Sequence, residues 1–405
     1  MENLTTLEGK YGEEGDRLLF RILNSGDPFE PFRSQQNVIK TSDVAEKGLR
    51  YDLTVPFARY VVMHQHETTF PFKRFQVQPV WRADRPQKGR YREFYQCDAD
   101  IIGSDSLLNE VELVQIIGDV FSQLKIPATV KLNNRKILFG IAEVLGMKDR
   151  FVDFTVALDK LDKIGLEKVN EELTAKGLSQ SNIKSLTEVI EKTKNATTTS
   201  QLAFLKNFLA ASETGLKGID EMSYVFELAG GDRSVTIELD ITLARGLNYY
   251  TGAIIEVKAN DIQMGSICGG GRYDDLTGIF GLPGMSGVGI SFGADRIYDV
   301  LMEKNLFPAF ENASTKILFV NFGEAESRHC LQLVSTLRKK NISAELYPDT
   351  VKMAKQLKYA NDKKIPFVAL IGSEEMNSGS VTVKNMGNGE QHKIPFDELP
   401  ALLKK

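Results

Sequence analysis

The chain has 405 residues, of which 42% are hydrophobic and 26% charged, as in an ordinary globular protein of two or three domains. Its 50 Lys and Arg residues against 54 Asp and Glu residues give a net charge of -4, which excludes a protein that binds nucleic acid through bulk positive charge. Cys97, Cys268 and Cys330 are far apart, so we expect neither a disulfide framework nor a paired-cysteine metal site. The acidic start and the lack of a long apolar run predict a soluble, cytoplasmic protein without membrane attachment.

The first third of the chain alternates strand-like runs with turns. Residues 72–83 and 92–103 alternate apolar and polar side chains, which is typical of antiparallel strands with one buried face. The segment DRPQKGRY between them contains the turn formers Pro86 and Gly89, so the two strands are predicted to form a long hairpin. Residues 106–124 follow with apolar side chains at helical spacing and predict an amphipathic helix.

The rest of the chain shows three further patterns. Residues 147–228 have helical periodicity with Lys- and Glu-rich faces, which predicts a small helical insertion. Strand-like sequence returns at residues 235–259. From about residue 315, short apolar runs alternate with amphipathic segments, which predicts βα units on a mainly parallel sheet.

The predicted hairpin is strongly basic. Between Lys73 and Arg92 there are seven basic residues and one acid, Asp84. Guanidinium groups match phosphate oxygens with paired hydrogen bonds, so the hairpin is a candidate phosphate site. A solvated charged hairpin is the alternative.

Two later segments, LARGLNYYTG and SICGGGRYDDL, contain residues suited to a binding site. In the first, Arg245 precedes two tyrosines, which fits a polar pocket that holds an anion. In the second, three consecutive glycines allow the backbone to approach a ligand closely, but no Lys-Ser/Thr pair completes a phosphate loop. The alternatives are an arginine at a strand end and a glycine-rich bend in a buried strand.

The segment GVGISFGADRIYDVL predicts a strand that ends at Gly293 and a helix that begins near Ala294. Arg296 then lies in the first helical turn, where the helix dipole favours an acid. We therefore expect a ligand or a local acid such as Asp295 to hold this arginine. A surface arginine is the alternative.

RADRPQKGRYREFYQ, LARGLNYYTG, GGGRYDDL and GISFGADRI, in this order, resemble the motifs of class II aminoacyl-tRNA synthetases. The second and third resemble the histidine-specific motifs of the histidyl-tRNA synthetase family, and the resemblance extends along the whole chain. It implies an α/β fold whose α+β catalytic domain has an antiparallel sheet flanked by helices. It implies a catalytic domain at 1–146 and 229–305, a helical insertion at 147–228 and a βα anticodon-binding domain at 314–405.

The resemblance also implies the activity. ATP, with Mg²⁺ bound to its phosphates, would activate L-histidine as histidyl-adenylate, and the histidyl group would then pass to the 3′ end of tRNA(His). No general base is required, because the attacking carboxylate is already ionised at neutral pH. The family is one of cytoplasmic homodimers that serve protein biosynthesis, and no metal site on the protein itself is expected.

The resemblance assigns roles to ten residues. Neutral imidazole has one donor and one acceptor nitrogen, so Asp100 and Tyr250 match its two partners, and Asp52 matches the partner of the α-amino group. By position in the motifs, the catalytic residues are Arg82 and Arg245, the ATP-binding residues are Arg82, Arg90 and Arg296, and the histidine-binding residues are Asp52, Thr54, Gln96, Asp100, Arg245, Tyr249 and Tyr250.

The C-terminal domain contains candidate contacts for tRNA. Lys355 and Lys358 lie on a predicted helix, and Glu374 and Glu375 lie on a predicted loop. A solvated helix face is the alternative for the two lysines. The mixed charge favours recognition of base edges and shape with modest phosphate contact.

The chain departs from the family pattern at two places. Asn248 stands where the family commonly has Asp. Met1 resembles the residue that follows motif 1, a helix and strand that build much of the dimer interface, so we expect motif 1 to be absent and the homodimer to be weakened.

Two other functions compete with the enzyme. One is a non-catalytic, synthetase-like regulator or sensor, and the other is a class II synthetase for threonine, proline or glycine. Retention of Arg82, Asp100, Arg245, Tyr250 and Arg296 disfavours the first. The two histidine-specific motifs disfavour the second.

Overall fold

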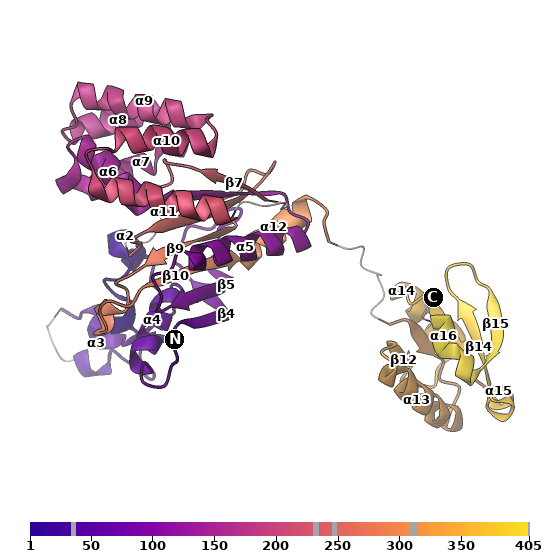
Figure 1. Cartoon of the computed structure of the whole chain (residues 1–405). Coiled ribbons are helices and arrows are strands. Elements are labelled where there is room, and N and C mark those ends of the chain that lie inside the picture. Colours follow the sequence, from indigo (N-terminus) through magenta and orange to yellow (C-terminus); the bar gives the residue numbers. More distant parts are fainter. Residues whose placement is uncertain (34–37, 230–234, 245–248, 308–314, 404–405) are drawn as a thin grey trace. The chain divides into compact units, whose positions relative to one another are not determined.

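The structure is a computed structural model (Figure 1), and it describes residues 1–33, 38–229, 235–244, 249–307 and 315–403. The chain forms two compact units, Met1–Leu306 and Phe307–Lys405. Each unit has hydrophobic clusters of its own and is described by itself.

A seven-stranded sheet is the frame of the first unit. In spatial order its strands are β4 (Phe72–Trp81), β5 (Glu93–Ile102), β10 (Gly287–Gly293), β9 (Cys268–Tyr273), β8 (Ala253–Ala259), β6 (Ala128–Asn134) and β7 (Val235–Leu239). All neighbouring strands run antiparallel except β6 and β7, which are parallel. The antiparallel sheet expected from the resemblance is therefore confirmed.

The predicted hairpin is formed by β4 and β5. Their register places Arg74 opposite Asp100 and Gln78 opposite Gln96, so these polar side chains share one face of the sheet. Phe75 and Val77 lie on the other face and are exposed. Alternation in the sequence thus located both strands to within two residues.

The glycine-rich segment forms strand β9, where it approaches β10 closely. A Cβ atom on Gly270 would lie 2.1 Å from the carbonyl oxygen of Gly289, which is too close for any side chain. A Cβ atom on Gly289 would in turn lie 2.0 Å from Oδ1 of Asp100. Glycine is required here because neighbouring main chain and a buried carboxyl fill the space that a side chain would need.

Helices cover the sheet of the first unit, as Figure 1 shows. Helix α5 buries Val111, Val114, Ile117 and Phe121, whose spacing of three or four residues gives one apolar face. The predicted helix at 106–124 is therefore confirmed. The helices beside the sheet are α4 (Thr54–Met63), α5 (Leu108–Gln123), α6 (Arg135–Val144), α11 (Glu213–Ala229) and α12 (Ala294–Glu303).

The middle of the chain is helical, as its periodicity predicts. It forms η2 (Lys148–Arg150), α7 (Phe151–Leu158), α8 (Leu161–Ala175), α9 (Gln180–Lys194) and α10 (Thr198–Phe208). Ser179 and Thr197 cap α9 and α10 by accepting backbone N–H groups. One hydrophobic cluster runs from the sheet into these helices, so the helices share the core of the first unit.

Short elements precede α4. Strands β1 (Glu2–Asn3), β3 (Lys47–Gly48) and β2 (Arg21–Ile22) form a small sheet in that spatial order. Around it lie α1 (Leu4–Leu7), α2 (Gly12–Arg17), η1 (Glu30–Phe32) and α3 (Thr41–Val44). A separate hydrophobic cluster joins this region to Tyr273 of β9.

The second unit has a five-stranded sheet. Its strands in spatial order are β12 (Ala344–Leu346), β11 (Ile317–Phe319), β13 (Phe367–Leu370), β14 (Ser380–Asn385) and β15 (Gln391–Pro395), with helices α13 (Glu324–Lys339), α14 (Met353–Asp362), α15 (Ser373–Ser378) and α16 (Leu399–Leu403). Only the first three strands are parallel, and β14 and β15 are antiparallel. The prediction of a mainly parallel sheet is therefore correct only for β12, β11 and β13, because β14 pairs antiparallel with β13 and β15 antiparallel with β14. It also missed β15, whose side chains are almost all exposed.

Candidate active site

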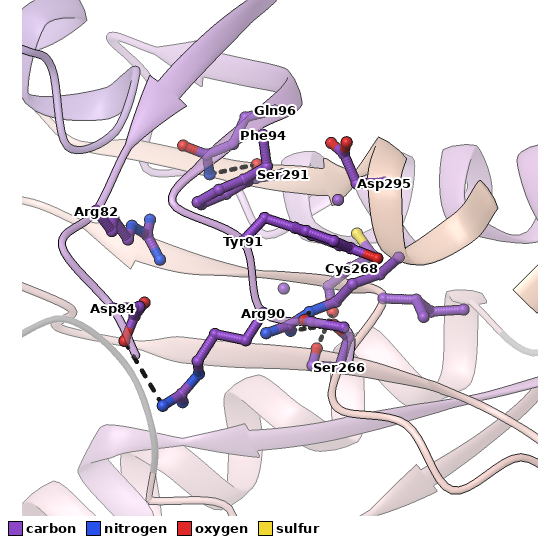
Figure 2. A pocket seen from close by; sticks show the side chains of 15 residues that line it. Arg82, Asp84, Arg90, Tyr91, Phe94, Gln96, Ser266, Cys268, Ser291 and Asp295 are labelled. Atoms are coloured by element: carbon purple, nitrogen blue, oxygen red, sulfur yellow. Dashed lines mark hydrogen bonds and ion pairs between the residues drawn. The ribbon is translucent and has the colours of Figure 1, made fainter. Parts of the chain in front are cut away.

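A cavity of about 220 Å³ opens between the hairpin and strands β9 and β10. Figure 2 shows the side chains that line it, among them Arg82 and Arg90 of the hairpin. Arg296 of α12 and Gln96 of β5 also line it, so the fold brings together four of the predicted site residues. The arginines come from two segments more than 200 positions apart in the sequence, and they give the cavity three cations against the two acids, Asp84 and Asp295, that also line it.

Arg82 is held at the end of the hairpin strand by its Nε and by two rings. The Nε atom donates to the carbonyl oxygen of Tyr51 at 3.1 Å. The guanidinium carbon lies 4.3 Å from the Tyr51 ring centroid and 5.2 Å from that of Phe94. Because these contacts fix the guanidinium plane, Arg82 enters the cavity in one defined direction.

Arg296 and Arg90 are held in different ways. Arg296 donates through Nε to the carbonyl oxygen of Gly89 at 2.6 Å and through Nη1 to that of Ser266 at 2.7 Å. Arg90 pairs with Asp84, with 3.6 Å between Nη1 and Oδ1. Burial lowers the pKa of Arg296, and the neighbouring charges of Arg90 and Arg82 lower it further. Because Arg296 lies close to two other cations, an anion bound between the three arginines would be attracted to them.

Of the two partners expected for Arg296, a ligand or a local acid such as Asp295, the acid is wrong and the ligand stays a prediction. The carboxyl of Asp295 accepts the backbone N–H of Tyr95 at 2.7 Å, and carbonyl oxygens hold Arg296 instead. The sequence pattern correctly predicted both residues in the first turn of α12. It did not predict that the main chain at Gly89 and Ser266 would supply the acceptors for Arg296.

A second, smaller cavity of about 20 Å³ adjoins the first one. The two cavities share Gly269 and Ser291 in their walls. Thr54, Asp100 and Tyr250, three predicted histidine-binding residues, line the smaller cavity. The basic cavity and this one are therefore neighbours on the glycine-rich strands, and we refer to the pair as the two-part site.

Asp100 is the buried acid of the smaller cavity. Asp100 is only 2% exposed, and its Oδ1 accepts a hydrogen bond from the hydroxyl of Tyr273 at 2.6 Å. Its Oδ2 lies 2.8 Å from Nη2 of Arg74. Burial raises the pKa of Asp100, whereas the charge of Arg74 lowers it. The sequence did not single out either partner for this role. Their contribution depends on strand register, because Arg74 faces Asp100 across β4 and β5.

Asp52 forms a second buried acid beside Tyr249. Its Oδ1 accepts the hydroxyl of Tyr11 at 3.1 Å and the backbone N–H of Val55 at 3.2 Å, and its Oδ2 accepts the hydroxyl of Tyr249 at 3.3 Å. Burial raises the pKa of Asp52, and the nearby Arg82 opposes this shift. An anion between two hydroxyl groups suits a bound ammonium group.

Gln96 links the two parts of the site. Its Nε2 donates to Oγ of Ser291 at 2.8 Å. Its Oε1 is buried and has no hydrogen-bond partner among the residues that the structure describes. A buried acceptor without a partner at a cavity wall indicates that a ligand donor completes it.

Two residues from the sequence analysis lie outside the described residues. Arg245, a predicted catalytic and histidine-binding residue, and Asn248 both belong to the segment 245–248. Within the described ranges, no three His, Cys, Asp or Glu side chains are arranged to hold a metal ion.

In the second unit, Lys355 and Lys358 lie on α14 and are exposed, as predicted. Glu374 and Glu375 do not lie on a loop, because they are in the short helix α15. There Glu375 accepts the backbone N–H of Gly372 at 3.1 Å, and Glu374 pairs with Lys393 at 2.9 Å. The two acids thus stabilise the start of this helix and its neighbouring strand.

Comparison with known proteins agrees with this geometry. A family model described as histidyl-tRNA synthetase matches residues 33–297, and one described as anticodon binding domain matches residues 316–405. The chain is 59% identical to the histidine–tRNA ligase of Phocaeicola vulgatus over 100% of this chain and 90% of that one. It is 54% identical to that of Christiangramia forsetii, again over 100% and 90%.

Solved structures show the same fold. The histidyl-tRNA synthetase from Nostoc sp. PCC 7120 has a TM-score of 0.78 at 27% identity and covers 99% of this chain and 94% of its own. Among the residues that the structure describes, every helix is too short or too polar to span a bilayer. From the family model and the closely related ligases, the chain belongs to the histidyl-tRNA synthetase family and is an aminoacyl-tRNA ligase.

Proposed function

We propose that the chain activates L-histidine with ATP and transfers the histidyl group to tRNA(His). The observation that carries this proposal is the two-part site, in which a cationic cavity and a small acidic cavity share Gly269 and Ser291. The triphosphate would occupy the first part and the imidazole the second. The α-phosphate and the histidine carboxylate would then meet at the shared wall.

In the first step, a histidine carboxylate oxygen attacks the α-phosphorus, a P–O bond forms, and the bond to the departing pyrophosphate breaks. The negative charge that develops on the phosphoryl oxygens needs cations that are already in place. We assign Arg82 to the α-phosphate, Arg90 and Arg296 to the outer phosphates, and Arg245 to the α-phosphate by its position in the family motif. In the second step, a ribose hydroxyl of the tRNA attacks the histidyl carbonyl and AMP leaves.

We assign histidine recognition to the acidic part of the site. Asp100 and Tyr250 would contact the two imidazole nitrogens, and Asp52, Thr54, Tyr249 and Gln96 would hold the α-amino end. The buried Oε1 of Gln96 and the paired hydroxyl groups at Asp52 support this arrangement. Mg²⁺ would bind with the nucleotide, because it prefers phosphate oxygens and water, and no dedicated protein ligand set is assigned to it.

The second unit would bind the anticodon, with α14 and its two exposed lysines as the contact region, and the helices at 147–228 would contact the tRNA. The domains at 1–146 with 229–305, 147–228 and 314–405 thus remain the proposed functional divisions. A cytoplasmic location also stays a prediction.

A homodimer is proposed on one structural observation. Strand β4 lies at an edge of the sheet, and its Phe75 and Val77 side chains are 85% and 53% exposed. Covering these side chains with a second copy would remove apolar surface from water. Light scattering after size exclusion measures the mass of the chain, and a monomer at every concentration would contradict the dimer.

The test of the function is ATP–pyrophosphate exchange with each of the twenty amino acids in turn. We expect exchange with histidine and none above background with the others, followed by charging of tRNA(His). Exchange with a different amino acid would indicate another specificity. A folded protein without exchange would favour the non-catalytic regulator, which the named relatives disfavour.

A further inference from the structure

Arg74 is a buried cation on the edge strand β4, behind the acidic cavity. Its side chain is 8% exposed. Its guanidinium carbon lies 4.1 Å from the Phe57 ring centroid, and Nη2 donates to the carbonyl oxygen of Leu53 at 3.3 Å. Arg74 does not line either cavity, so it lies behind the residues that would touch a substrate.

Two glutamine amides on the same strand fix the other side of the guanidinium. Arg74 donates through Nη1 to Oε1 of Gln76, and Gln76 donates through Nε2 to Oε1 of Gln78 at 3.0 Å. Arg50 donates to the same oxygen of Gln78. This hydrogen-bonded row extends from the segment that carries Asp52 to Asp100, and it leaves Arg74 little freedom to turn.

The row ends at two carboxyl groups. Nη2 of Arg74 lies 2.8 Å from Oδ2 of Asp100 and 3.9 Å from Oδ2 of Asp98. Asp98 and Asp100 are 3% and 2% exposed, and their ion pairs found within the described residues are both with Arg74. Burial raises the pKa of each carboxyl, and the charge of Arg74 opposes the shift at both.

The other groups around the pair are hydroxyls and acids. Tyr273 of β9 donates to Asp100, and Ser291 of β10 lies beside Asp98 in strand register. The charge of Asp52 adds to the repulsion felt by Asp98. Among the described neighbours, therefore, the positive charge that favours ionisation of the pair comes from Arg74.

We propose that Arg74 is a positioning residue that determines specificity for histidine, by keeping the Asp100 carboxyl ionised and turned to accept an imidazole N–H. This inference rests on the proposed function. An ionised carboxyl has about four acceptor positions, and Tyr273 uses one of them at Oδ1. Oδ2 forms the ion pair with Arg74 and has no hydrogen-bond partner among the described residues, so acceptor positions remain for the substrate. A hydrogen bond to an ionised carboxyl is roughly twice as strong as one to a neutral acceptor.

A purely structural role makes a different prediction. If Arg74 only stabilised the fold, its replacement would lower stability and affect both substrates alike. If Arg74 keeps Asp100 ionised, its loss weakens histidine binding alone, and raising the pH restores the binding because hydroxide then removes the proton.

The experiment compares wild type with Arg74→Gln in ATP–pyrophosphate exchange on the full chain. Glutamine keeps an amide donor and removes the charge. At pH 7 we expect the histidine KM to rise by about tenfold or more and the ATP KM to stay within about twofold. The comparison is repeated in proteins that also carry Asp98→Asn, so that the second carboxyl does not titrate. There, the histidine KM of the protein with Arg74→Gln, divided by that of the protein with Arg74, should fall between pH 7 and pH 9.

Lys131→Gln is the matched control. Lys131 lies on β6 of the same sheet and pairs with Asp240 at 2.6 Å, away from both cavities of the proposed site. Its removal should change stability but neither KM. An unchanged histidine KM in Arg74→Gln, an equal rise of both KM values, or a ratio independent of pH would overturn the inference.

A variant that retains the charge covers the case in which Arg74→Gln does not fold. For Arg74→Lys we expect a rise in histidine KM of about two- to fivefold without a change in ATP KM, because one ammonium replaces the guanidinium fork. A rise in histidine KM as large as that expected for Arg74→Gln, or an equal rise in ATP KM, would overturn the inference, because lysine keeps the charge. Wild-type protein without histidine-dependent exchange would instead refute the proposed function, and with it this inference.

Discussion

Asp98 and Asp100 stand two positions apart on β5, so they share one face of the sheet and one cation. Burial and the charge of Asp100 raise the pKa of Asp98 to about 8. Asp98 therefore carries a proton at neutral pH. Asp100 lies closer to Arg74 than Asp98 does, so the positive charge stabilises an ionised Asp100 more strongly. Burial raises the pKa of Asp100 as well, and the inferred role of Arg74 is to leave Asp100 ionised while Asp98 keeps its proton.

The first prediction concerns Asp100. Replacement by Ala removes the proposed acceptor for imidazole, so the histidine KM in pyrophosphate exchange should rise by about tenfold or more, and the ATP KM should stay within about twofold. Equal changes in both constants would show that Asp100 supports the fold and not the specificity.

The second prediction concerns the stability of Asp98→Asn. Between about pH 4 and pH 8 the folded state keeps the Asp98 proton and the unfolded state does not. The free energy of unfolding of wild type therefore falls by about 1.4 kcal/mol for each pH unit in this range. Above pH 8 both states have lost the proton, and the contribution of Asp98 no longer changes. Asparagine does not titrate. In urea denaturation, the stability of the variant relative to wild type should therefore rise by about 2 to 3 kcal/mol between pH 6 and pH 8. A difference that is constant with pH would be inconsistent with a protonated Asp98.

At the scale of elements, helix α12 holds the tip of the hairpin with three acids spaced four residues apart. Asp295 accepts the backbone N–H of Tyr95, Asp299 accepts the hydroxyl of Tyr91 at 2.6 Å, and Glu303 pairs with Lys88 at 2.8 Å. One face of one helix thereby sets the position of the loop that carries Arg90.

The third prediction follows from this contact. Asp299→Ala removes the partner of Tyr91, which lines the basic cavity next to Arg90. The ATP KM should rise by about three- to tenfold, while stability changes by about 1 kcal/mol because the bond is exposed. Histidine KM serves as the internal control and should not move. A loss of stability without a change in ATP KM would contradict the positioning of the loop by α12.

Sequence periodicity was enough for α5 and for the helical middle of the chain, because each buries one apolar face. Alternation also located the hairpin, although on β4 the more sheltered face is the polar one and Phe75 and Val77 are exposed. It was not enough for β15, whose residues are mostly exposed, nor for the helical state of Glu374, since α15 has only six residues. The motifs indicated Asp100 and Tyr250. The contact of Arg74 with Asp100 depends on which residues face each other across two strands, and a single sequence does not specify that register.

At the scale of the whole molecule, the chain is divided into two units with separate hydrophobic clusters. All described residues of the proposed two-part site belong to the first unit, Met1–Leu306. We therefore expect adenylate formation to need only the first unit, whereas the proposed anticodon contacts lie in the second.

The fourth prediction tests this separation with residues 1–306 alone. The fragment should fold cooperatively and retain histidine-dependent pyrophosphate exchange. Charging of tRNA(His) should fall by about 100-fold, because the proposed anticodon contacts are lost, equivalent to about 2.8 kcal/mol of binding. Loss of exchange in a folded fragment would show that the second unit contributes to the chemistry.

The close approach of β9 and β10 has a consequence for how this enzyme can change. Where Gly270 and Gly289 face each other, the wall of the site is bare peptide, and any replacement adds atoms where another backbone oxygen or a carboxyl already stands. Mutation at these positions can only make the site smaller or push the strands apart. A wider or altered choice of amino acid must therefore arise from other positions in the walls of the two cavities, because glycine already gives the site its largest size at this wall.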